Sequence, residues 1–371
     1  MNIPIFRLNY EEEFIEEYLQ GAKDILTEGF IGEFGKHVKM FEESFAELID
    51  TKYCAAVANG TSALEVALKT IDVRGKKVIM PSNTFFATSI AVTNADAEIV
   101  LVDIEEENFS ICPEDLKRKM TEDVGAVIIV HIGGIISKHY KEIQSICKEN
   151  NVALIEDAAH AHSSNIDGNY AGSIGDMGCF SFFPTKVMTT GEGGMVSTNN
   201  EEYHKRIRSI KNFGRHLDDA GLCVTPQGQH STISNFTGLL GHLETKRAKD
   251  RVALRREYVE LYDTLLKGTG YEVVKQERGN CAYYKCIVKI PCEREWLRQY
   301  CKERNITLTG EVYKKPVHQQ PLYQDREYNL PVTDKVCASH ICPPLYPELT
   351  VEEIVYICDV LKQAEVDYGK E

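Results

Sequence analysis

The chain has 371 residues, of which 43% are hydrophobic and 26% are charged. These proportions are typical of a globular protein and exclude a largely disordered or fibrous chain. With 42 Lys and Arg against 56 Asp and Glu, the formal net charge is −14, which repels a polyanion, so we expect no nucleic acid partner.

The sequence carries no sign of a targeting or membrane segment. Residues 1–7 lack the basic and apolar regions of a signal peptide. The longest apolar stretch, residues 125–136, is shorter than the ~20 residues that cross a bilayer. The 12 cysteines include no CxxC pair and no zinc-ligand spacing, so we expect reduced thiols and no metal site. We therefore expect a cytoplasmic protein without membrane contact.

Short apolar runs alternate with stretches of helical periodicity between residue 38 and about residue 200. Runs that are apolar at every position are typical of strands that helices cover on both faces of a parallel sheet. The expected strands are residues 53–57, 77–80, 98–102, 126–130, 152–155, 178–182 and 194–198. The expected helices are residues 38–50, 61–70, 85–93, 113–120 and 139–150. The sequence therefore predicts an α/β fold with a mostly parallel sheet flanked by helices.

A long helical stretch, residues 236–266, separates this part from the C-terminal end of the chain. Beyond it we expect strands at residues 271–274 and 283–290 and helices at residues 293–303 and 351–362. We therefore expect a large domain of residues 1–250 and a smaller C-terminal α/β domain of residues 251–371.

The tetrapeptide Asn59-Gly60-Thr61-Ser62 joins an expected strand to an expected helix. Free backbone N–H groups and the helix dipole at such a junction favour an anion, and the two hydroxyls add donors. Alternatively, Thr61 or Ser62 is simply the N-cap of the helix, which needs no ligand. The tetrapeptide alone leaves both interpretations open.

Acidic residues follow another expected strand, in the sequence Glu156-Asp157-Ala158-Ala159-His160. The carboxyl end of a strand is where open α/β sheets bind ligands. A carboxylate at Asp157 is costly there unless it meets a cation, such as a protonated heteroaromatic nitrogen. Capping of the next helix or a pair with Arg is the alternative. We interpret His160 as a hydrogen-bonding residue that faces the ligand.

Lys186 ends the aromatic segment Phe180-Ser-Phe-Phe-Pro-Thr-Lys186. Apolar neighbours remove water from a lysine and lower its pKa, which prepares the amine for Schiff-base chemistry. A solvated loop lysine is the alternative. The chain contains no GxGxxG, P-loop, GxSxG or HExxH motif, so the dinucleotide, nucleotide, serine-hydrolase and zinc-protease classes gain no support.

Four segments in chain order resemble the DegT/DnrJ/EryC1/StrS family of sugar aminotransferases, which are pyridoxal-phosphate enzymes of the aspartate aminotransferase fold type I. The resemblance covers about residues 32–361. The segments that carry it are Asn59–Leu64, Pro81–Thr88, Glu156–His160 and Phe180–Lys186, the last with Gly191–Gly194.

The resemblance implies that Lys186 binds pyridoxal 5'-phosphate covalently and then moves a proton, and that Asp157 pairs with the pyridine nitrogen. The other residues that it implies around the cofactor are Thr61, Ser62 and Ser181 at the phosphate, Phe85 over the ring, His160 near the 3-hydroxyl, and Asn235 at the phosphate of a neighbouring subunit. It therefore implies a homodimer with its sites at the subunit interface. His318 and Glu192 are the candidates for contact with the substrate.

Two departures concern the substrate end of the pocket in the family. Thr237 stands where relatives commonly have Arg, and residues 131–136 differ from the common His-Leu-Tyr-Gly form. Whether the sugar is nucleotide-linked therefore stays open. Lys186 argues against the dehydrating relatives, which have His at that position.

We thus expect an aminotransferase that transfers an amino group from L-glutamate to a keto-sugar in amino-sugar biosynthesis. A pyridoxal-phosphate-dependent sugar dehydratase or deaminase, and a non-catalytic regulator that retains the fold, are the alternatives.

Overall fold

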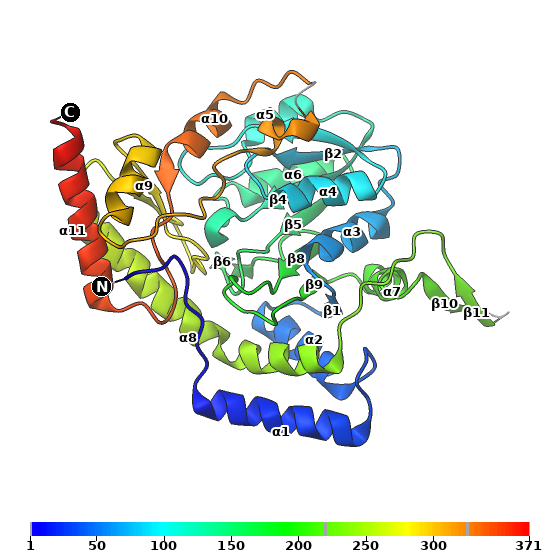
Figure 1. The fold of residues 1–371 in the computed structure, drawn as a ribbon. Helices are drawn as coiled ribbons and strands as arrows, with labels where there is room; N and C mark the ends of the chain where they lie inside the picture. Colours follow the sequence, from blue (N-terminus) through cyan, green and yellow to red (C-terminus); the bar gives the residue numbers. More distant parts are fainter. Residues whose placement is uncertain (1, 219–220, 324–325, 371) are drawn as a thin grey trace.

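A seven-stranded sheet lies at the centre of the molecule (Figure 1). The computed structural model describes residues 2–218, 221–323 and 326–370. The sheet has the order β1-β9-β8-β5-β4-β2-β3, and its strands are parallel except β9, which is antiparallel to both of its neighbours. The strands are β1 (Tyr53–Val57), β2 (Lys77–Pro81), β3 (Glu98–Val102), β4 (Val124–Val130), β5 (Ala153–Asp157), β8 (Met177–Ser181) and β9 (Gly194–Thr198). The expected mostly parallel α/β fold is confirmed.

The sheet is buried on both faces because its strands are apolar at successive positions. In β4, Val127 and Ile129 belong to one hydrophobic cluster, whereas Ile128 and Val130 belong to another. Alternate residues of a strand point to opposite faces, so each face packs against its own layer. The helices of this part are α2 (Lys36–Leu48), α3 (Gly60–Ile71), α4 (Phe86–Asn94), α5 (Pro113–Lys119), α6 (Tyr140–Glu149) and α7 (Glu201–Ile210).

Helix α8 (Asn235–Leu266) links the two ends of the molecule (Figure 1). It contacts α2 on one side and α11 and β12 on the other. The elements beyond it are β12 (Glu272–Val274), β13 (Ile287–Lys289), α9 (Arg294–Lys302), the short helices η2 (Val317–Gln319) and η3 (Pro321–Tyr323), α10 (Pro331–Ala338), β14 (His340–Ile341) and α11 (Val351–Tyr368). The strand expected at 283–290 is shorter than expected, because Tyr283 has a φ of +43°, which a strand does not tolerate.

The first helix, α1 (Glu12–Glu28), was not expected from the sequence and lies along the outside of the molecule (Figure 1). Before it, the Ile3 N–H donates to the carbonyl oxygen of Asn305 at 2.9 Å, and Arg7 forms a 2.8 Å ion pair with Glu353. The start of the chain therefore packs on the C-terminal part. A division at residue 250 falls inside α8, and the domain boundary stays a prediction.

The smaller elements are the turn η1 (Ile132–Gly134) and the pairs β6 (Asn165–Ile166) with β7 (Asn169–Tyr170) and β10 (Arg215–Asp218) with β11 (Gly221–Val224). The β10–β11 hairpin projects from the body of the molecule (Figure 1). Within the described ranges, no helix is long and apolar enough to cross a bilayer, and no three metal-binding side chains come together.

His162 is a buried polar residue in the hydrophobic layer behind β8. Its ring centroid lies 5.2 Å from that of Phe182, 5.6 Å from Phe180 and 6.3 Å from Phe45. Burial among these rings lowers the pKa of His162 to about 3, so its imidazole is neutral in the folded protein at ordinary pH.

We predict that His162 contributes to acid destabilisation. As the pH falls below the unfolded pKa of about 6.5, the unfolded chain takes up a proton that folded His162 refuses, so folding stability falls with pH. The variant His162→Leu should therefore lose stability less steeply in urea unfolding between pH 6.5 and 5, with a difference in slope that rises to at most about 1.4 kcal/mol per pH unit. Phe45→Leu changes the same layer without a titratable group and should keep the wild-type slope. Equal slopes for wild type and His162→Leu would contradict this assignment.

Candidate active site

A cavity of about 400 Å³ opens at the carboxyl end of the parallel strands. Its size suits a small aromatic ligand, and its position is the one where α/β sheets bind ligands. The sheet edge, the start of α3, the loop before α4 and two tyrosines from the C-terminal part form its wall. The predicted site residues that line it are Thr61, Phe85, Asp157, His160, Ser181, Lys186 and Glu192.

Asp157 ends β5 and places a buried carboxylate in this cavity, with 7% of the residue exposed. Its Oδ2 accepts a 2.8 Å hydrogen bond from the Thr88 hydroxyl, and its Oδ1 accepts one of 3.3 Å from the Ala159 N–H. Burial raises the pKa of Asp157, although these bonds and the charge of Lys186 oppose the rise. No basic side chain of the described residues lies within ion-pair distance of it. The carboxylate therefore still lacks a cation.

The neighbouring Glu156 points to the other face of the strand and is saturated by the protein. Its two oxygens accept hydrogen bonds from the N–H groups of Gly172, Ile174 and Gly175, and His131 Nε2 lies 2.8 Å away. Of the two adjacent carboxylates, only Asp157 is available to a ligand, because successive residues of a strand face opposite ways.

Lys186 lies in the loop after β8 and lines the cavity from another side. Its Nζ is 4.5 Å from the ring centroid of Tyr284, whose hydroxyl is 3.0 Å from Thr185 Oγ1. Burial lowers the pKa of Lys186, with Tyr284 and Asp157 acting in the opposite direction. A lowered pKa enlarges the fraction of free amine, which is the nucleophilic form.

His160 is held as a neutral ring by partners on both nitrogens. The Gly133 N–H donates to Nδ1 at 3.3 Å, so the ring proton lies on Nε2, 3.2 Å from the Tyr313 hydroxyl oxygen. Burial lowers the pKa of His160 well below its usual value, and Lys186 and Lys285 repel a second proton. Because Nε2 donates to Tyr313, the phenolic hydrogen of Tyr313 is available to a ligand in the cavity.

The start of α3 approaches the sheet edge very closely. A Cβ at Gly194 would lie 2.2 Å from the carbonyl oxygen of Asn59, and one at Gly60 would lie 2.8 Å from Ser181 Cβ. Only glycine fits at such distances. The N-cap is Asn59, whose side chain accepts from the Ser62 N–H at 2.8 Å, and not Thr61 or Ser62 as the capping alternative supposed. The first N–H groups of α3 and the Thr61 hydroxyl thus face the cavity without a capping role.

Three predicted residues lie outside the cavity lining. Ser62 takes part in the cap through its N–H. Asn235 uses its amide within the chain, accepting from the His37 N–H at 2.9 Å and donating to the Phe30 carbonyl at 2.7 Å. His318 has Nδ1 2.8 Å from Ser82 Oγ and Nε2 3.0 Å from Asp334. The roles expected of these residues at the phosphate and the substrate stay predictions.

The cavity residues that were given no role from the sequence include Thr84, Thr88, Tyr284 and Tyr313. Thr84 Oγ1 and Thr88 Oγ1 are 2.8 Å apart, as their spacing of four residues at the start of a helix allows. The spacing of these two threonines within Pro81–Thr88 is the sequence feature from which they could have been predicted. The two tyrosines come from irregular segments far along the chain, and no local pattern marks them.

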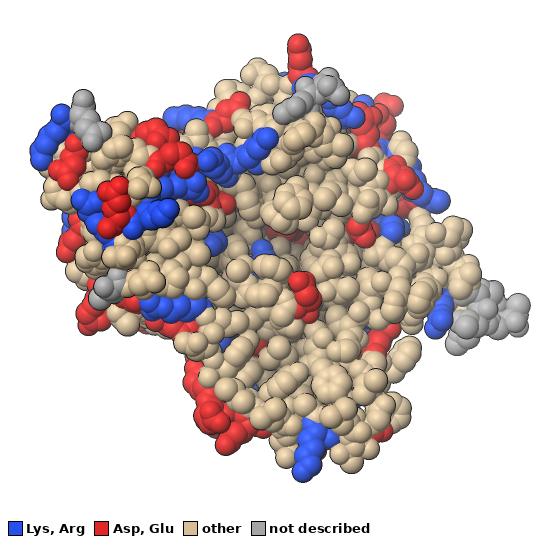
Figure 2. Space-filling model, viewed as in Figure 1, with Lys and Arg blue, Asp and Glu red and all other residues tan. Residues whose placement is uncertain are grey.

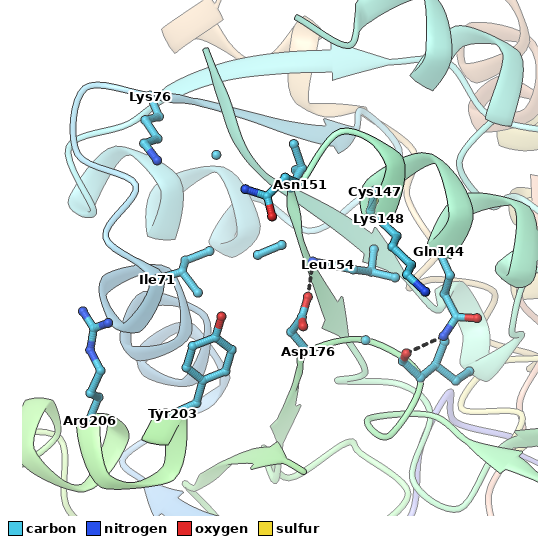
Figure 3. A pocket seen from close by; sticks show the side chains of 15 residues that line it. Ile71, Lys76, Gln144, Cys147, Lys148, Asn151, Leu154, Asp176, Tyr203 and Arg206 are labelled. Atoms are coloured by element: carbon cyan, nitrogen blue, oxygen red, sulfur yellow. Dashed lines mark hydrogen bonds between the residues drawn. The ribbon is translucent and has the colours of Figure 1, made fainter. Parts of the chain in front are cut away.

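A second cavity, of about 590 Å³, lies at the opposite, amino-terminal edge of the sheet (Figure 3). Figure 3 shows Asp176 at its centre, where its Oδ2 accepts from the Leu154 N–H at 2.8 Å, and Gln144, which donates to the Ile174 carbonyl oxygen. The second cavity brings together no buried amine and carboxylate pair. The candidate active site is therefore the cavity of Asp157 and Lys186.

Comparisons with known proteins agree with this geometry. Residues 12–362 match the DegT/DnrJ/EryC1/StrS aminotransferase family. GDP-perosamine synthase of Escherichia coli O157:H7 is 29% identical over 97% of this chain and 98% of its own. The solved structure of DesI in the presence of its TDP-sugar product is 25% identical, with a TM-score of 0.91 over 100% of this chain and 94% of DesI.

A further solved structure shows the same fold. Spr1654 of Streptococcus pneumoniae in its PLP form has a TM-score of 0.91 at 23% identity, over 99% of this chain and 100% of its own. The match over nearly the whole chain decides the family. The protein belongs to the DegT/DnrJ/EryC1/StrS aminotransferase family and is a pyridoxal-phosphate-dependent aminotransferase.

Proposed function

We propose that this aminotransferase moves the amino group of L-glutamate onto the ketone of a nucleotide-linked sugar. Glutamate loses its α-amino group and α-hydrogen and becomes 2-oxoglutarate, while the sugar carbonyl becomes a carbon that bears hydrogen and an amino group. The donor carbon is oxidised by two electrons and the acceptor carbon is reduced by two, so no external oxidant is needed. The similarity of this chain to GDP-perosamine synthase and to DesI, whose structure was solved in the presence of a TDP-sugar, supports a sugar of this class.

The observation that carries the proposal is that Lys186 and Asp157 line one cavity of suitable size. The residues present fit pyridoxal phosphate, because the buried carboxylate lacks a cation that a protonated pyridine nitrogen would supply. When bound, the cofactor supplies an electron sink for the carbon that loses its proton. The start of α3 with Thr61 and Ser181 would hold the phosphate, and Phe85 would cover the ring.

The chain's own residues then divide the work. Lys186 would hold the cofactor through its amine and would move the proton at the reacting carbon. Asp157 would keep the proton on the ring nitrogen, and Thr88 orients that carboxylate. His160 and Tyr313 form the neutral, hydrogen-bonding side of the cavity. A lysine in this place favours transamination over the dehydration or deamination considered as an alternative.

We also propose that the active form is a homodimer. The loop between α1 and α2 exposes Phe34 at 79%, Phe30 at 65% and Ile31 at 55%, which is unusual for side chains that meet only water. Asn235 holds this loop through the Phe30 carbonyl. Figure 2 shows that the lower centre of this face, over the region of α2 and the start of α8 in Figure 1, is largely uncharged. Such a surface suits a second copy of the chain.

A reducing compartment agrees with the thiols. All 11 cysteines whose side chains are described are free, and nine of these are buried. Disulfides are rare in the cytosol, so we place the protein in the cytoplasm as part of this proposal.

The reaction is tested with purified holoenzyme, L-glutamate and a set of GDP- and TDP-linked keto-sugars. We expect equal amounts of 2-oxoglutarate and amino-sugar by mass spectrometry. Borohydride should fix the cofactor on Lys186, and Lys186→Ala should lose at least about 1,000-fold of the rate, because general acid–base and nucleophilic roles are both removed. Labelling of another lysine, or release of ammonia without an amino-sugar, would refute the proposal.

Asp157→Asn should lower the rate about 100-fold or more while the cofactor still binds. Asparagine has the same shape but carries no negative charge, so it does not hold a proton on the ring nitrogen. Thr88→Val removes the 2.8 Å hydrogen bond yet keeps the carboxylate, so it should cost clearly less. The measurement is the single-turnover rate of each variant and of the wild type at saturating cofactor. Equal losses of rate in Asp157→Asn and Thr88→Val would contradict the role of Asp157.

Gly194→Ala should weaken cofactor binding by about tenfold or more, since its Cβ would displace the Asn59 carbonyl and with it the start of α3. Gly369→Ala is the control, because an added Cβ there meets no atom closer than 3.5 Å and the position is far from the cavity. Fluorescence titration of each apoprotein with pyridoxal phosphate gives the dissociation constants. An unchanged dissociation constant in Gly194→Ala would contradict the assignment of the start of α3 to the phosphate site.

A further inference from the structure

Lys285 is a second ammonium group beside the catalytic cavity, and the reaction described above does not use it. Both lysines lie near the ring of Tyr284: the Lys186 Nζ is 4.5 Å and the Lys285 Nζ is 5.1 Å from its centroid. Lys285 is partly buried, and its charge is felt at Lys186, His160 and Tyr284. Lys285 therefore adds a second positive charge beside the cavity, next to the lining residue Tyr284.

This charge is uncompensated by the protein. Among the described residues, no carboxylate lies within 4.0 Å of the Lys285 Nζ and no hydrogen bond satisfies it. Glu311, the residue after Gly310, already forms an ion pair with Arg298. Lys285 is thus a cation without a counterion in a protein whose net charge is −14. An ammonium group without a counterion in the protein can bind the anionic group of a ligand.

The position of Lys285 points to the substrate rather than to the cofactor. The phosphate site is built by α3 and β8, at the edge of the central sheet. The Lys285 Nζ instead lies near Gly310, where an added Cβ would be 3.3 Å away, in the loop that also carries Tyr313. Tyr284 and Tyr313 line the cavity from the C-terminal part of the chain. A ligand that reaches Lys285 therefore contacts the wall formed by the C-terminal part of the chain, and not the wall formed by α3 and β8.

Resting on the function proposed above, we propose that the Lys285 ammonium binds an oxyanion of the substrate. Both substrates have one: L-glutamate carries two carboxylates, and a nucleotide-linked sugar carries a diphosphate. The ammonium forms charge-assisted hydrogen bonds with either group. Lys285 would thus supply a positive charge for the anion that is distinct from the amine of Lys186.

The test measures each half-reaction of the holoenzyme separately through the visible absorbance of the bound cofactor. In one arm L-glutamate is varied, and in the other a nucleotide-linked keto-sugar is added to the aminated enzyme. Lys285→Gln should raise the half-saturating concentration of one substrate about 10-fold to 100-fold and change the maximal rate much less. Lys285→Arg should restore most of the affinity, because the charge is kept. Lys302→Gln, a change of the same charge at an exposed position of α9, should have no effect.

The two arms distinguish the source of the anion. A loss confined to the glutamate arm assigns a donor carboxylate, and a loss confined to the sugar arm assigns the diphosphate. Unchanged half-saturation in both arms, or a fall in maximal rate alone, would overturn the proposal, because Lys285 would then act only through Lys186 or through the fold. If the wild-type enzyme reacts with neither substrate, the proposed function itself is refuted. That result differs from unchanged half-saturation in Lys285→Gln, which refutes only the role of Lys285.

Discussion

The site depends on a buried carboxylate that the protein itself does not neutralise. Asp157 has neutral hydrogen-bond donors, Thr88 and the Ala159 N–H, but no cation in contact. Burial of such a group is unfavourable for the isolated chain. Under the proposed function, a protonated ring nitrogen in the cavity would supply the missing cation, and the same low-polarity surroundings would strengthen that ion pair.

The architecture of the sheet explains why this carboxylate is available. β5 is a central strand, and its last two residues are both acidic. One of them, Glu156, is consumed by backbone donors and His131, which ties the strand to the segment around Gly172. The other is turned into the cavity by the alternation of the strand. Of two neighbouring acids, one is therefore used to hold the fold, whereas the other stays available to a ligand.

The C-terminal part of the chain completes the cavity from the other side. Tyr284 and Tyr313 surround His160, with ring centroids 4.2 Å and 6.2 Å from it. The Tyr313 N–H also donates to Asn83 Oδ1 at 3.0 Å, which joins this part to the loop after β2. One side of the cavity thus comes from the sheet, whereas Tyr284 and Tyr313 on the other side come from segments beyond α8, where we propose that the substrate binds. This separation is consistent with a common reaction applied to different sugars within one family.

The sequence by itself determined the class of fold and the central chemistry. Apolar runs such as 126–130 predicted the buried strands, and the ordered segments around Asp157 and Lys186 predicted the amine, the carboxylate and the cofactor. These signals are local, because a strand and the loop at its end are read within a few residues. The N-cap at Asn59 was less clear, since several adjacent residues can cap a helix.

Only the tertiary structure decided which distant residues complete the site. Thr88 reaches Asp157 across 69 positions of sequence, and Tyr313 reaches His160 across 153. It also showed that Asn235 and His318 use their polar atoms inside the chain. No pattern along the chain encodes such contacts, because the hydrogen bonds form only after long loops close and bring separate elements to one sheet edge. The partnerships of side chains are properties of the packed molecule, whereas the periodicity that builds its strands and helices is a property of the chain.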